Sequence, residues 1–372
     1  MRSKASKWEF AEMKKVLILG AGKIGRIAAV MLRESGEYAV TLADSNGHML
    51  EICAKDDAAT LVKVDVTDEA ALTEVAKGHD AILSTCPFYL NVAIARVARS
   101  VGASYFDVTE DVETTRAIRN IAKDADGAFV PQCGLAPGFI SIAAHDLFKR
   151  FDSVQNLRLR VGALPQNPTN RLKYNLTWST DGLINEYLNP CEAIHKGKRI
   201  EVLPLEGYER FTIDGTEYEA FNTSGGVGAL CDMLEGKVEN LDYKTVRYPG
   251  HQEILKILIE DLGLGKRPDL MKEIFEKSLP ITSQDVIVIF ADAIGTRDGE
   301  LCEENFIRKV HGTAIGGKNW SAIQITTSAG LCAVMDMVLT GKLAGKGYIR
   351  QEQVSLDDFL ANRFGRYFSL ED

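Results

Sequence analysis

One segment near the start of the chain constrains the fold more than any other. Residues 16–19 are an apolar run of strand length, and they lead directly into a G-x-G-x-x-G turn at residues 20–25. A helix-forming run follows, and the next strand, residues 39–43, ends in Asp44. Strand, glycine turn, helix, strand and acid occur in the order that a dinucleotide-binding βαβ unit requires. The alternative is a packing turn between helix and strand that happens to be rich in glycine.

Each glycine of this turn matches a requirement of such a site. Gly20 allows the tight turn, Gly22 lets a pyrophosphate approach the backbone, and Gly25 lets the helix pack closely on the strand. The phosphates would lie at the amino end of the helix, beside Lys23 and Ile24, because the free N–H groups and the helix dipole favour an anion there. The turn therefore predicts a dinucleotide cofactor.

The acid after the second strand indicates which dinucleotide binds. A carboxylate at Asp44 would accept hydrogen bonds from the adenosine ribose diol and repel a 2′-phosphate. The three residues that follow it include no arginine. The sequence therefore favours NAD over NADP, although Asp44 could instead cap the next helix.

Length and composition narrow the class of protein. A chain of 372 residues exceeds what one hydrophobic core usually fills, so two domains are expected. The formal charge of −9 argues against a nucleic-acid partner. No apolar run approaches the roughly 20 residues that span a bilayer, so no membrane partner is expected. Seven scattered cysteines without a C-x-x-C pair indicate a reducing, cytoplasmic location and no metal site.

The first third of the chain alternates strands with helices. This alternation predicts an α/β fold, a Rossmann-type doubly wound parallel sheet over residues 13–138, preceded by an extension at residues 1–12. Ligands of such sheets bind beyond the carboxyl ends of the strands. The strands are expected at residues 16–19, 39–43, 60–64, 81–85, 104–107 and 128–131.

The pattern changes after the crossover helix that begins at Phe139. Alternating segments then predict a second, mixed α/β domain with a broad sheet over residues 139–325, which could also serve as a dimerisation platform. The Asp298-Gly299 pair predicts a hairpin turn between two long strands. Residues 326–372 are expected to be helices that return to the first domain, starting near Ser328. The strands of the second domain are expected at residues 157–161, 174–178, 199–203, 218–221, 284–296 and 301–310.

Two further strand ends offer contacts to the cofactor. Asp65 and Val66 follow the third strand and would lie beside the adenine, but Asp65 could equally cap a turn with Thr67. Thr85, Cys86 and Pro87 break the fourth strand and should face the nicotinamide, because proline cannot continue a strand ladder. Cys86 is read as a small half-buried residue rather than as a nucleophile, since no histidine stands near it in the sequence.

The hinge between the domains is a third candidate. Gly134 lies in a loop rich in glycine and proline, residues 133–139, that leads into a helix. Loops of this kind carry function more often than average, although a simple turn is the alternative.

Polar and aromatic residues of the second domain suit a small polar ligand. His251 begins a helix and could accept a proton, and Arg247 could bind a carboxylate with two hydrogen bonds. A structural histidine and a surface ion pair are the respective alternatives. The polar and aromatic cluster comprises Asn175, Trp178, Ser179, Glu186 and Tyr187. The alternative is that these residues form a strand and the core face of a helix.

Together these motifs resemble the saccharopine dehydrogenase/lysine 6-dehydrogenase family, from Lys14 to about Phe368. The segments that carry the resemblance are VLILGAGKIG at residue 16, CGLAPGF at residue 133, WSTDGLINEY at residue 178, TSGG at residue 223 and RYPGH at residue 247. The tryptophan–serine and arginine–tyrosine stretches are more specific than the glycine turn. They favour the short, lysine 6-dehydrogenase-like branch.

The resemblance implies a reaction. L-Lysine would be oxidised by NAD at its terminal amine, the imine hydrolysed to allysine with release of ammonia, and the aldehyde cyclised to 1-piperideine-6-carboxylate. His251 or Asp107 would accept the proton of the ε-amine. Arg247, Asn175 and the backbone that begins at Thr223 would bind the α-carboxylate.

Three other interpretations stay open. A dehydrogenase for saccharopine or a carboxylated polyamine would need further cations, which Arg171, Lys173, Lys196 and Arg199 could supply. A non-catalytic NAD-binding module would bind the cofactor without oxidising an amine. A homodimer, formed through the second domain, is compatible with each function.

Overall fold

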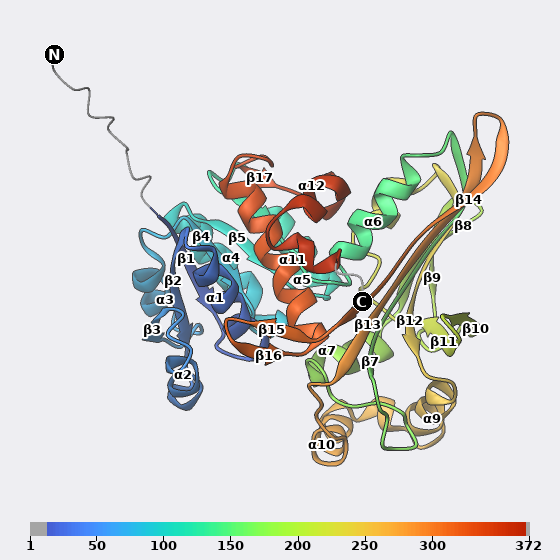
Figure 1. Ribbon diagram of the computed structural model, residues 1–372, viewed down its shortest axis with the longest axis horizontal. Coiled ribbons are helices and arrows are strands. Elements are labelled where there is room, and N and C mark those ends of the chain that lie inside the picture. Colours follow the sequence, from blue (N-terminus) through green and yellow to red (C-terminus); the bar gives the residue numbers. More distant parts are fainter. Residues whose placement is uncertain (1–12, 370–372) are drawn as a thin grey trace.

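The computed structural model describes residues 13–369, and the extension expected at residues 1–12 lies outside them. Within this range the chain forms a parallel sheet of seven strands and a mixed sheet of eight. Figure 1 shows the two sheets on either side of the long helix α11 (Ala322–Leu339). The predicted fold class, a Rossmann-type doubly wound sheet with a second mixed α/β unit, is confirmed.

The parallel sheet has the strand order β17-β6-β5-β4-β1-β2-β3. Its neighbours β4 and β2 lie on opposite sides of β1, so the chain changes direction there, at the kind of switch point where open α/β sheets bind ligands. The last strand, β17, comes from the carboxyl-terminal part and pairs with β6. The strands are β1 (Lys14–Leu19), β2 (Tyr38–Asp44), β3 (Thr60–Lys63), β4 (Ala81–Ser84), β5 (Ser104–Asp107), β6 (Ala128–Val130) and β17 (Gly347–Tyr348).

Helices cover both faces of this sheet, and the central strands are therefore apolar on both sides. The last four residues of β1 and all four of β4 are buried. Gly36 caps the carboxyl end of helix α1 and takes the left-handed conformation common at helix ends. The helices of this part are α1 (Lys23–Ser35), α2 (Gly47–Ala54), α3 (Glu69–Ala76), α4 (Asn91–Val101) and α5 (Val112–Ile121).

The mixed sheet has the order β10-β11-β12-β7-β13-β14; β8 also pairs with β12, and β9 pairs with β8. Strands β13 and β14 form the predicted hairpin, because Asp298 and Gly299 both take the positive φ of its turn. The strands are β7 (Ser153–Pro165), β8 (Cys191–His195), β9 (Lys198–Val202), β10 (Glu209–Ile213), β11 (Thr216–Asn222), β12 (Val238–Arg247), β13 (Asp285–Arg297) and β14 (Glu300–His311).

Short elements complete the second part of the chain. A two-stranded ribbon, β15 (Thr313–Ile315) and β16 (Lys318–Trp320), precedes α11. The remaining helices are α6 (Phe139–Phe148), α7 (Thr180–Leu188), α8 (Leu230–Leu234), α9 (His251–Lys256), α10 (Pro268–Ser278) and α12 (Leu356–Ala361).

Helix α11 joins the two sheets in one core. It contacts α1 on one side and β13 on the other, and Ala329 belongs to the same apolar cluster as Ile18 and Ile289. It begins six residues before the predicted Ser328, because Ser321 and Gln324 form a capping box. Among residues 13–369 it is the one helix long and apolar enough to cross a bilayer, and 83% of that stretch is buried inside the protein.

One predicted strand of the second domain is wrong. Residues 174–178 form an irregular segment with a single bridge, between Leu176 and Ile281. The side chain of Asn170 donates to the carbonyl of Tyr174 at 2.7 Å and accepts from its N–H at 3.3 Å. A local side chain thus takes the backbone groups that a strand ladder would use.

Candidate functional site

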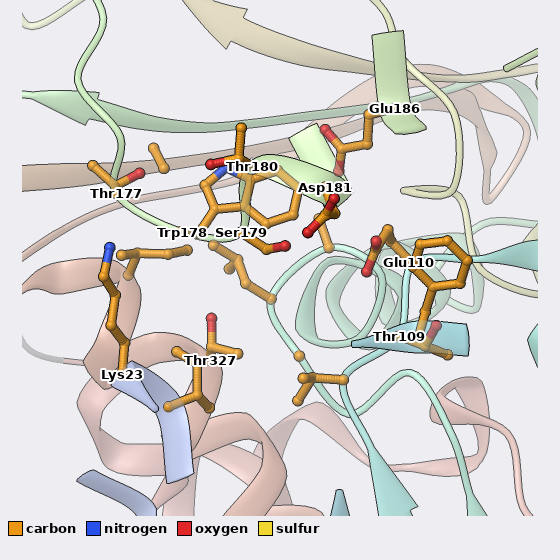
Figure 2. A pocket seen from close by; sticks show the side chains of 18 of the residues that line it. Lys23, Thr109, Glu110, Thr177, Trp178, Ser179, Thr180, Asp181, Glu186 and Thr327 are labelled. Carbon is orange, nitrogen blue, oxygen red and sulfur yellow. The ribbon is translucent and has the colours of Figure 1, made fainter. Parts of the chain in front are cut away.

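A cavity of about 640 Å³ lies where the two sheets meet. From the first sheet it receives the loops that follow β4, β5 and β6, together with the start of α1. From the second part it receives β7, β12 and the segment that leads into α7, whose residues Thr177, Trp178 and Ser179 are seen in Figure 2. The cavity therefore lies beyond the carboxyl ends of the parallel strands, where ligands of doubly wound sheets bind.

The glycine turn has the geometry that a dinucleotide needs. Gly20 has a φ of +100°, and a Cβ at Gly25 would collide with the carbonyl oxygen of Gly20. A Cβ at Gly22 would meet nothing within 4 Å, so the space above the first turn of α1 is open. Gly22 caps α1 without a side-chain hydrogen bond, which leaves the N-terminal amides available for phosphate oxygens. These residues fit a bound dinucleotide.

Asp44 lies at the end of β2 and is tied to the glycine turn. Its carboxylate accepts hydrogen bonds from the N–H of Ala21 at 2.7 Å and of Asn46 at 2.8 Å. The residue that caps α2 is Asn46, whose side chain accepts from the N–H of His48. Asp44 therefore holds a negative charge beside the turn rather than capping the helix.

Asp65 occupies an exposed turn. Its carboxylate accepts from the N–H of Thr67 at 2.9 Å and from its hydroxyl at 2.7 Å, and these bonds lower the pKa of Asp65. The turn-capping alternative describes this local geometry. Neither Asp65 nor Val66 lines the cavity.

The residues predicted to face the nicotinamide line one wall of the cavity together with Lys23 and Ile24, predicted to lie beside the phosphates, and with Gly134 of the hinge loop. Burial raises the pKa of the Cys86 thiol to about 12, so this cysteine is protonated at neutral pH and is a poor nucleophile. Thr85 donates its hydroxyl proton toward the carbonyls of Leu19 and Gly20, which links this wall to the glycine turn. The wall consists of Lys23, Ile24, Thr85, Cys86, Pro87 and Gly134.

Two carboxyl groups also line the cavity, the buried Glu186 and the partly buried Glu110, and Figure 2 shows both side chains. Burial raises the pKa of Glu110, in the loop after β5, to about 7. Burial also raises the pKa of Glu186, on α7, to about 8, although the positive charge of Arg247 opposes this and the charge of Glu110 adds to it. Perturbed carboxyls in a cavity are candidates for proton transfer or for binding a cationic ligand.

Arg247 brings a buried positive charge to the same cavity. It is 2% exposed and lies at the end of β12. Its Nε donates to the hydroxyl of Tyr187 at 3.2 Å, and its Nη1 donates to the carbonyl of Val246 at 2.8 Å. Among the described residues no carboxylate forms an ion pair with it. A buried guanidinium without a counter-ion suits an anionic ligand such as a carboxylate.

The position of His251 argues against its predicted role as proton acceptor. It is 1% exposed and does not line the cavity. Its Nδ1 donates to the carbonyl of Leu172 at 2.8 Å, and its Nε2 lies 3.2 Å from the hydroxyl of Tyr187. Burial and the charge of Arg247 lower the pKa of His251 to about 3. The imidazole is thus enclosed behind Tyr187 and Arg247, out of reach of a substrate amine.

Asp107 is also enclosed. It is fully buried, and its carboxylate accepts from Thr109, Gln132 and the hydroxyl of Tyr105 at 2.7 to 3.0 Å. Burial raises its pKa to about 6 against the effect of these bonds. Asp107 fixes the two loops that carry Glu110 and Gly134, and it does not line the cavity.

The other predicted substrate residues divide into two groups. Trp178 and Ser179 line the cavity with Glu186 and Arg247, and Ser179 also caps α7. Asn175, Tyr187 and Thr223 are buried behind the lining.

Sequence reasoning singled out Asp107 at the end of the fifth strand and missed Glu110, three residues later. Gly225 makes room for this loop, since a Cβ there would collide with the carbonyl oxygen of Glu110. The signal that could have found Glu110 is its place at the carboxyl end of a central strand. Which of two nearby acids faces the cavity depends on the loop conformation.

Sequence models of two domains of one family match nearly all of the chain. Residues 16–130 match the saccharopine dehydrogenase NADP binding domain, and residues 134–364 match the saccharopine dehydrogenase C-terminal domain.

Curated relatives carry names from the same family. The mitochondrial alpha-aminoadipic semialdehyde synthase of Rattus norvegicus is 23% identical over 353 residues, which cover 85% of this chain and 35% of the synthase. The saccharopine dehydrogenase (NADP(+), L-glutamate-forming) of Saccharomyces cerevisiae is 24% identical over 303 residues, which cover 77% of this chain and 66% of that enzyme. The match thus spans about a third of the synthase and two thirds of the yeast enzyme.

A solved structure shares the fold. The apo histidine-tagged saccharopine dehydrogenase (L-Glu forming) from Saccharomyces cerevisiae has a TM-score of 0.76 and 17% identity, and the match covers 91% of this chain and 94% of that chain. The matched domains, which meet at the hinge loop and enclose the cavity between them, confirm the resemblance noted in the sequence. This chain belongs to the saccharopine dehydrogenase family.

Proposed function

We propose that this protein is a pyridine-nucleotide-dependent oxidoreductase that removes a hydride from the ε-carbon of L-lysine. Hydrolysis of the resulting imine would give an aldehyde and ammonia. The observation that supports this substrate best is the set of charges around the cavity. One buried guanidinium, Arg247, shares the site with the buried carboxyl of Glu186 and the partly buried carboxyl of Glu110.

This set of charges matches an amino acid with one carboxylate and two amines. Arg247 would bind the α-carboxylate, and Glu186 would bind the α-ammonium beside it, because the positive charges of Arg247 and of that ammonium both favour its ionised form. The aliphatic stem of the substrate would lie against the apolar part of the lining. Val161, Ala163, Leu176, Ile281 and Ile323 provide that part.

Glu110 is the proposed proton acceptor. It lies in a loop of the first domain, as does the wall assigned to the nicotinamide, whereas Glu186 lies with Arg247 in the second part. The ε-ammonium must lose a proton before its lone pair can form the C=N bond as the hydride leaves. A bound pyridine nucleotide would accept that hydride. Water then adds to the imine carbon, and ammonia leaves as the aldehyde forms.

Saccharopine is the second candidate, and the names of the relatives favour it. In saccharopine the ε-nitrogen of lysine also carries a glutarate group, so two further carboxylates must be accommodated. Besides Arg247, the one cation that lines the cavity in the described part of the chain is Lys23, at the start of α1. The four cations considered for extra carboxylates, Arg171, Lys173, Lys196 and Arg199, do not line it. The lining thus supports lysine over saccharopine.

For the cofactor we propose NAD. The family description and the yeast relative both name NADP. In this chain, however, Asp44 keeps a carboxylate beside the glycine turn, and a 2′-phosphate would approach that charge.

For the assembly we propose a homodimer through β14, the edge of the mixed sheet. Among residues 13–369 this strand pairs with β13 alone, so its outer edge offers unpaired backbone groups. Antiparallel pairing of two copies about Phe306 would set Glu303 opposite Lys309 and Glu304 opposite Arg308. Opposite charges would then meet across the two-fold axis.

A substrate screen tests the proposed reaction. L-Lysine, saccharopine and 1,5-diaminopentane are offered with NAD and with NADP, and formation of the reduced nucleotide is followed. Lysine with NAD should react fastest, and its product should give the coloured adduct that cyclic imines form with o-aminobenzaldehyde. Reaction with saccharopine alone would assign the second candidate. Cofactor binding without oxidation of any amine would indicate a non-catalytic module.

A further inference from the structure

His251, which is enclosed behind the cavity, has a role that the proposed proton transfer does not use. We infer that His251 is a positioning residue that acts through Tyr187 to hold the guanidinium of Arg247 ready for a carboxylate. This inference rests on the proposed function only in its choice of ligand, the α-carboxylate of an amino acid. It is carried by the directions of three consecutive hydrogen bonds.

The first bond fixes the tautomer of His251. Nδ1 lies 2.8 Å from the carbonyl oxygen of Leu172, and a carbonyl can only accept, so Nδ1 carries the proton. Among residues 13–369 the ring has no carboxylate partner, and it lies near the positive charge of Arg247, so it is neutral. Its Nε2 therefore carries a lone pair.

The second and third bonds follow from the first. Nε2 lies 3.2 Å from the hydroxyl of Tyr187, so this hydroxyl must donate to it. The oxygen of Tyr187 then keeps its own lone pairs for Arg247, whose Nε–H lies 3.2 Å away. With the opposite tautomer, Nε2–H and Nε–H would both donate to the hydroxyl oxygen, and its own proton would have no acceptor in this chain of bonds.

The arrangement leaves one edge of the guanidinium for a ligand. Nε donates to the hydroxyl of Tyr187, and Nη1 donates to the carbonyl of Val246 at 2.8 Å. Nη2 has no hydrogen-bond partner among the described residues. The ring of Tyr174, with its centre 5.0 Å from the guanidinium carbon, fixes the plane. An oriented guanidinium binds a carboxylate with two bonds and loses little side-chain entropy in doing so.

The titratable and charged groups around His251 come from several elements. They are Tyr174 from the irregular segment, Tyr187 from α7 and Arg247 from β12. The rings of Tyr174 and Phe221 pack against the imidazole, with centres 5.3 and 6.2 Å away. Because the surroundings keep His251 neutral, it should not shape the pH profile of the reaction.

The test separates carboxylate binding from chemistry. Tyr187→Phe removes the central hydroxyl, His251→Leu removes both ring nitrogens, and His251→Gln keeps one donor and one acceptor. Binding of L-norleucine, which has the α-carboxylate but no ε-amine, is measured by calorimetry on variants whose circular dichroism and melting match the wild type. Tyr187→Phe and His251→Leu should weaken binding by at least about tenfold, and His251→Gln should restore part of it.

Kinetics with two substrates provide the second readout. For L-lysine, Tyr187→Phe should raise KM by a similar factor with kcat nearly unchanged, because the lost contact acts on bound and reacting substrate alike. For 1,5-diaminopentane, which lacks the carboxylate, KM should not change.

Unchanged norleucine binding in folded variants, or a wild-type protein that does not bind norleucine, would overturn the inference. A loss of kcat in Tyr187→Phe with both amines would also overturn it. The same holds if His251→Gln loses one limb of the pH profile. If norleucine binding responds as expected but no amine is oxidised, the inference stands and the proposed reaction fails.

Discussion

At the scale of single residues, burial divides the ionisable groups of the site into two kinds. Glu110 and Glu186 face the cavity, and burial moves the pKa of each carboxyl toward or above neutrality. His251 and Asp107 are fully buried, and their hydrogen-bonding atoms are occupied by protein groups. An ionisable side chain whose hydrogen bonds are all made within the protein stabilises the local structure. A side chain in the cavity without hydrogen-bond partners is available to bind a ligand.

The first prediction concerns Glu110. Glu110→Gln should lower the turnover of lysine by roughly 10²-fold, because the amide cannot accept the ε-ammonium proton. A base acts when it is deprotonated, and the pKa of Glu110 is raised to about 7, so wild-type activity should fall as the pH drops below neutrality. This limb should be absent from the pH profile of the variant.

Glu186→Gln is the matched control for that prediction. It changes the same functional group in the same cavity, but it should mainly raise KM, because Glu186 is assigned to the α-ammonium. Steady-state rates across pH for both variants decide the assignment. If Glu186→Gln loses turnover and Glu110→Gln does not, the two roles are exchanged.

At the scale of elements, the start of α1 is the part on which cofactor binding depends. Gly22→Val should abolish NAD binding while the fold persists, because its side chain would enter the open space above the turn. Gly25→Val should instead destabilise the protein, since its Cβ would collide with the carbonyl oxygen of Gly20. Calorimetry and thermal unfolding separate the two outcomes. A folded Gly22→Val protein that binds NAD normally would remove the phosphate site from this turn.

The end of β2 carries the prediction on cofactor choice. Asp44→Ala should weaken NAD binding and narrow the preference over NADP, because it removes both the acceptor for the ribose and the charge that opposes a 2′-phosphate. Asp65→Ala, in an exposed turn at the end of the neighbouring strand β3, should change neither affinity. Equal wild-type kinetics with the two nucleotides would show that Asp44 does not discriminate.

At the scale of the whole molecule, α11 and the core around it hold the two sheets together and so set the shape of the cavity. Ile323 and Thr327 of α11 line the cavity, and the hydroxyl of Ser328 donates to the carbonyl of Ile24 at 3.0 Å. The helix thereby ties the cofactor side of the site to the mixed sheet.

The edge strand of the mixed sheet carries the prediction on assembly. Glu303→Lys would set like charges opposite each other in the proposed dimer and should shift the protein toward monomer in light scattering at low ionic strength. Glu300→Lys makes the same charge change at the start of β14, opposite the uncharged Gly312 in that register, and should leave the dimer intact. Equal dimerisation of both variants would exclude this edge as the interface.

The sequence by itself determined the elements whose signals are local. The glycine turn, the order of strand and helix, and Asp298-Gly299 each fix a conformation through adjacent residues, and these elements form as predicted. Local signals also misled in places. Residues 174–178 alternate like a strand, but Asn170 takes both backbone groups of Tyr174, and α11 starts at a capping box rather than at Ser328.

Only the tertiary structure decided which polar residues meet. Glu110 and Glu186 are far apart in the sequence and face one cavity, whereas His251 and Arg247 are close in the sequence and only the arginine lines it. Sequence spacing cannot reveal these relations, because they depend on how loops of the parallel sheet pack against α7 and β12. The pKa of a carboxyl likewise depends on its burial and on charges brought near by folding. The sequence therefore determines which residue types are present, and the packing of the two sheets around α11 determines which of them line the cavity.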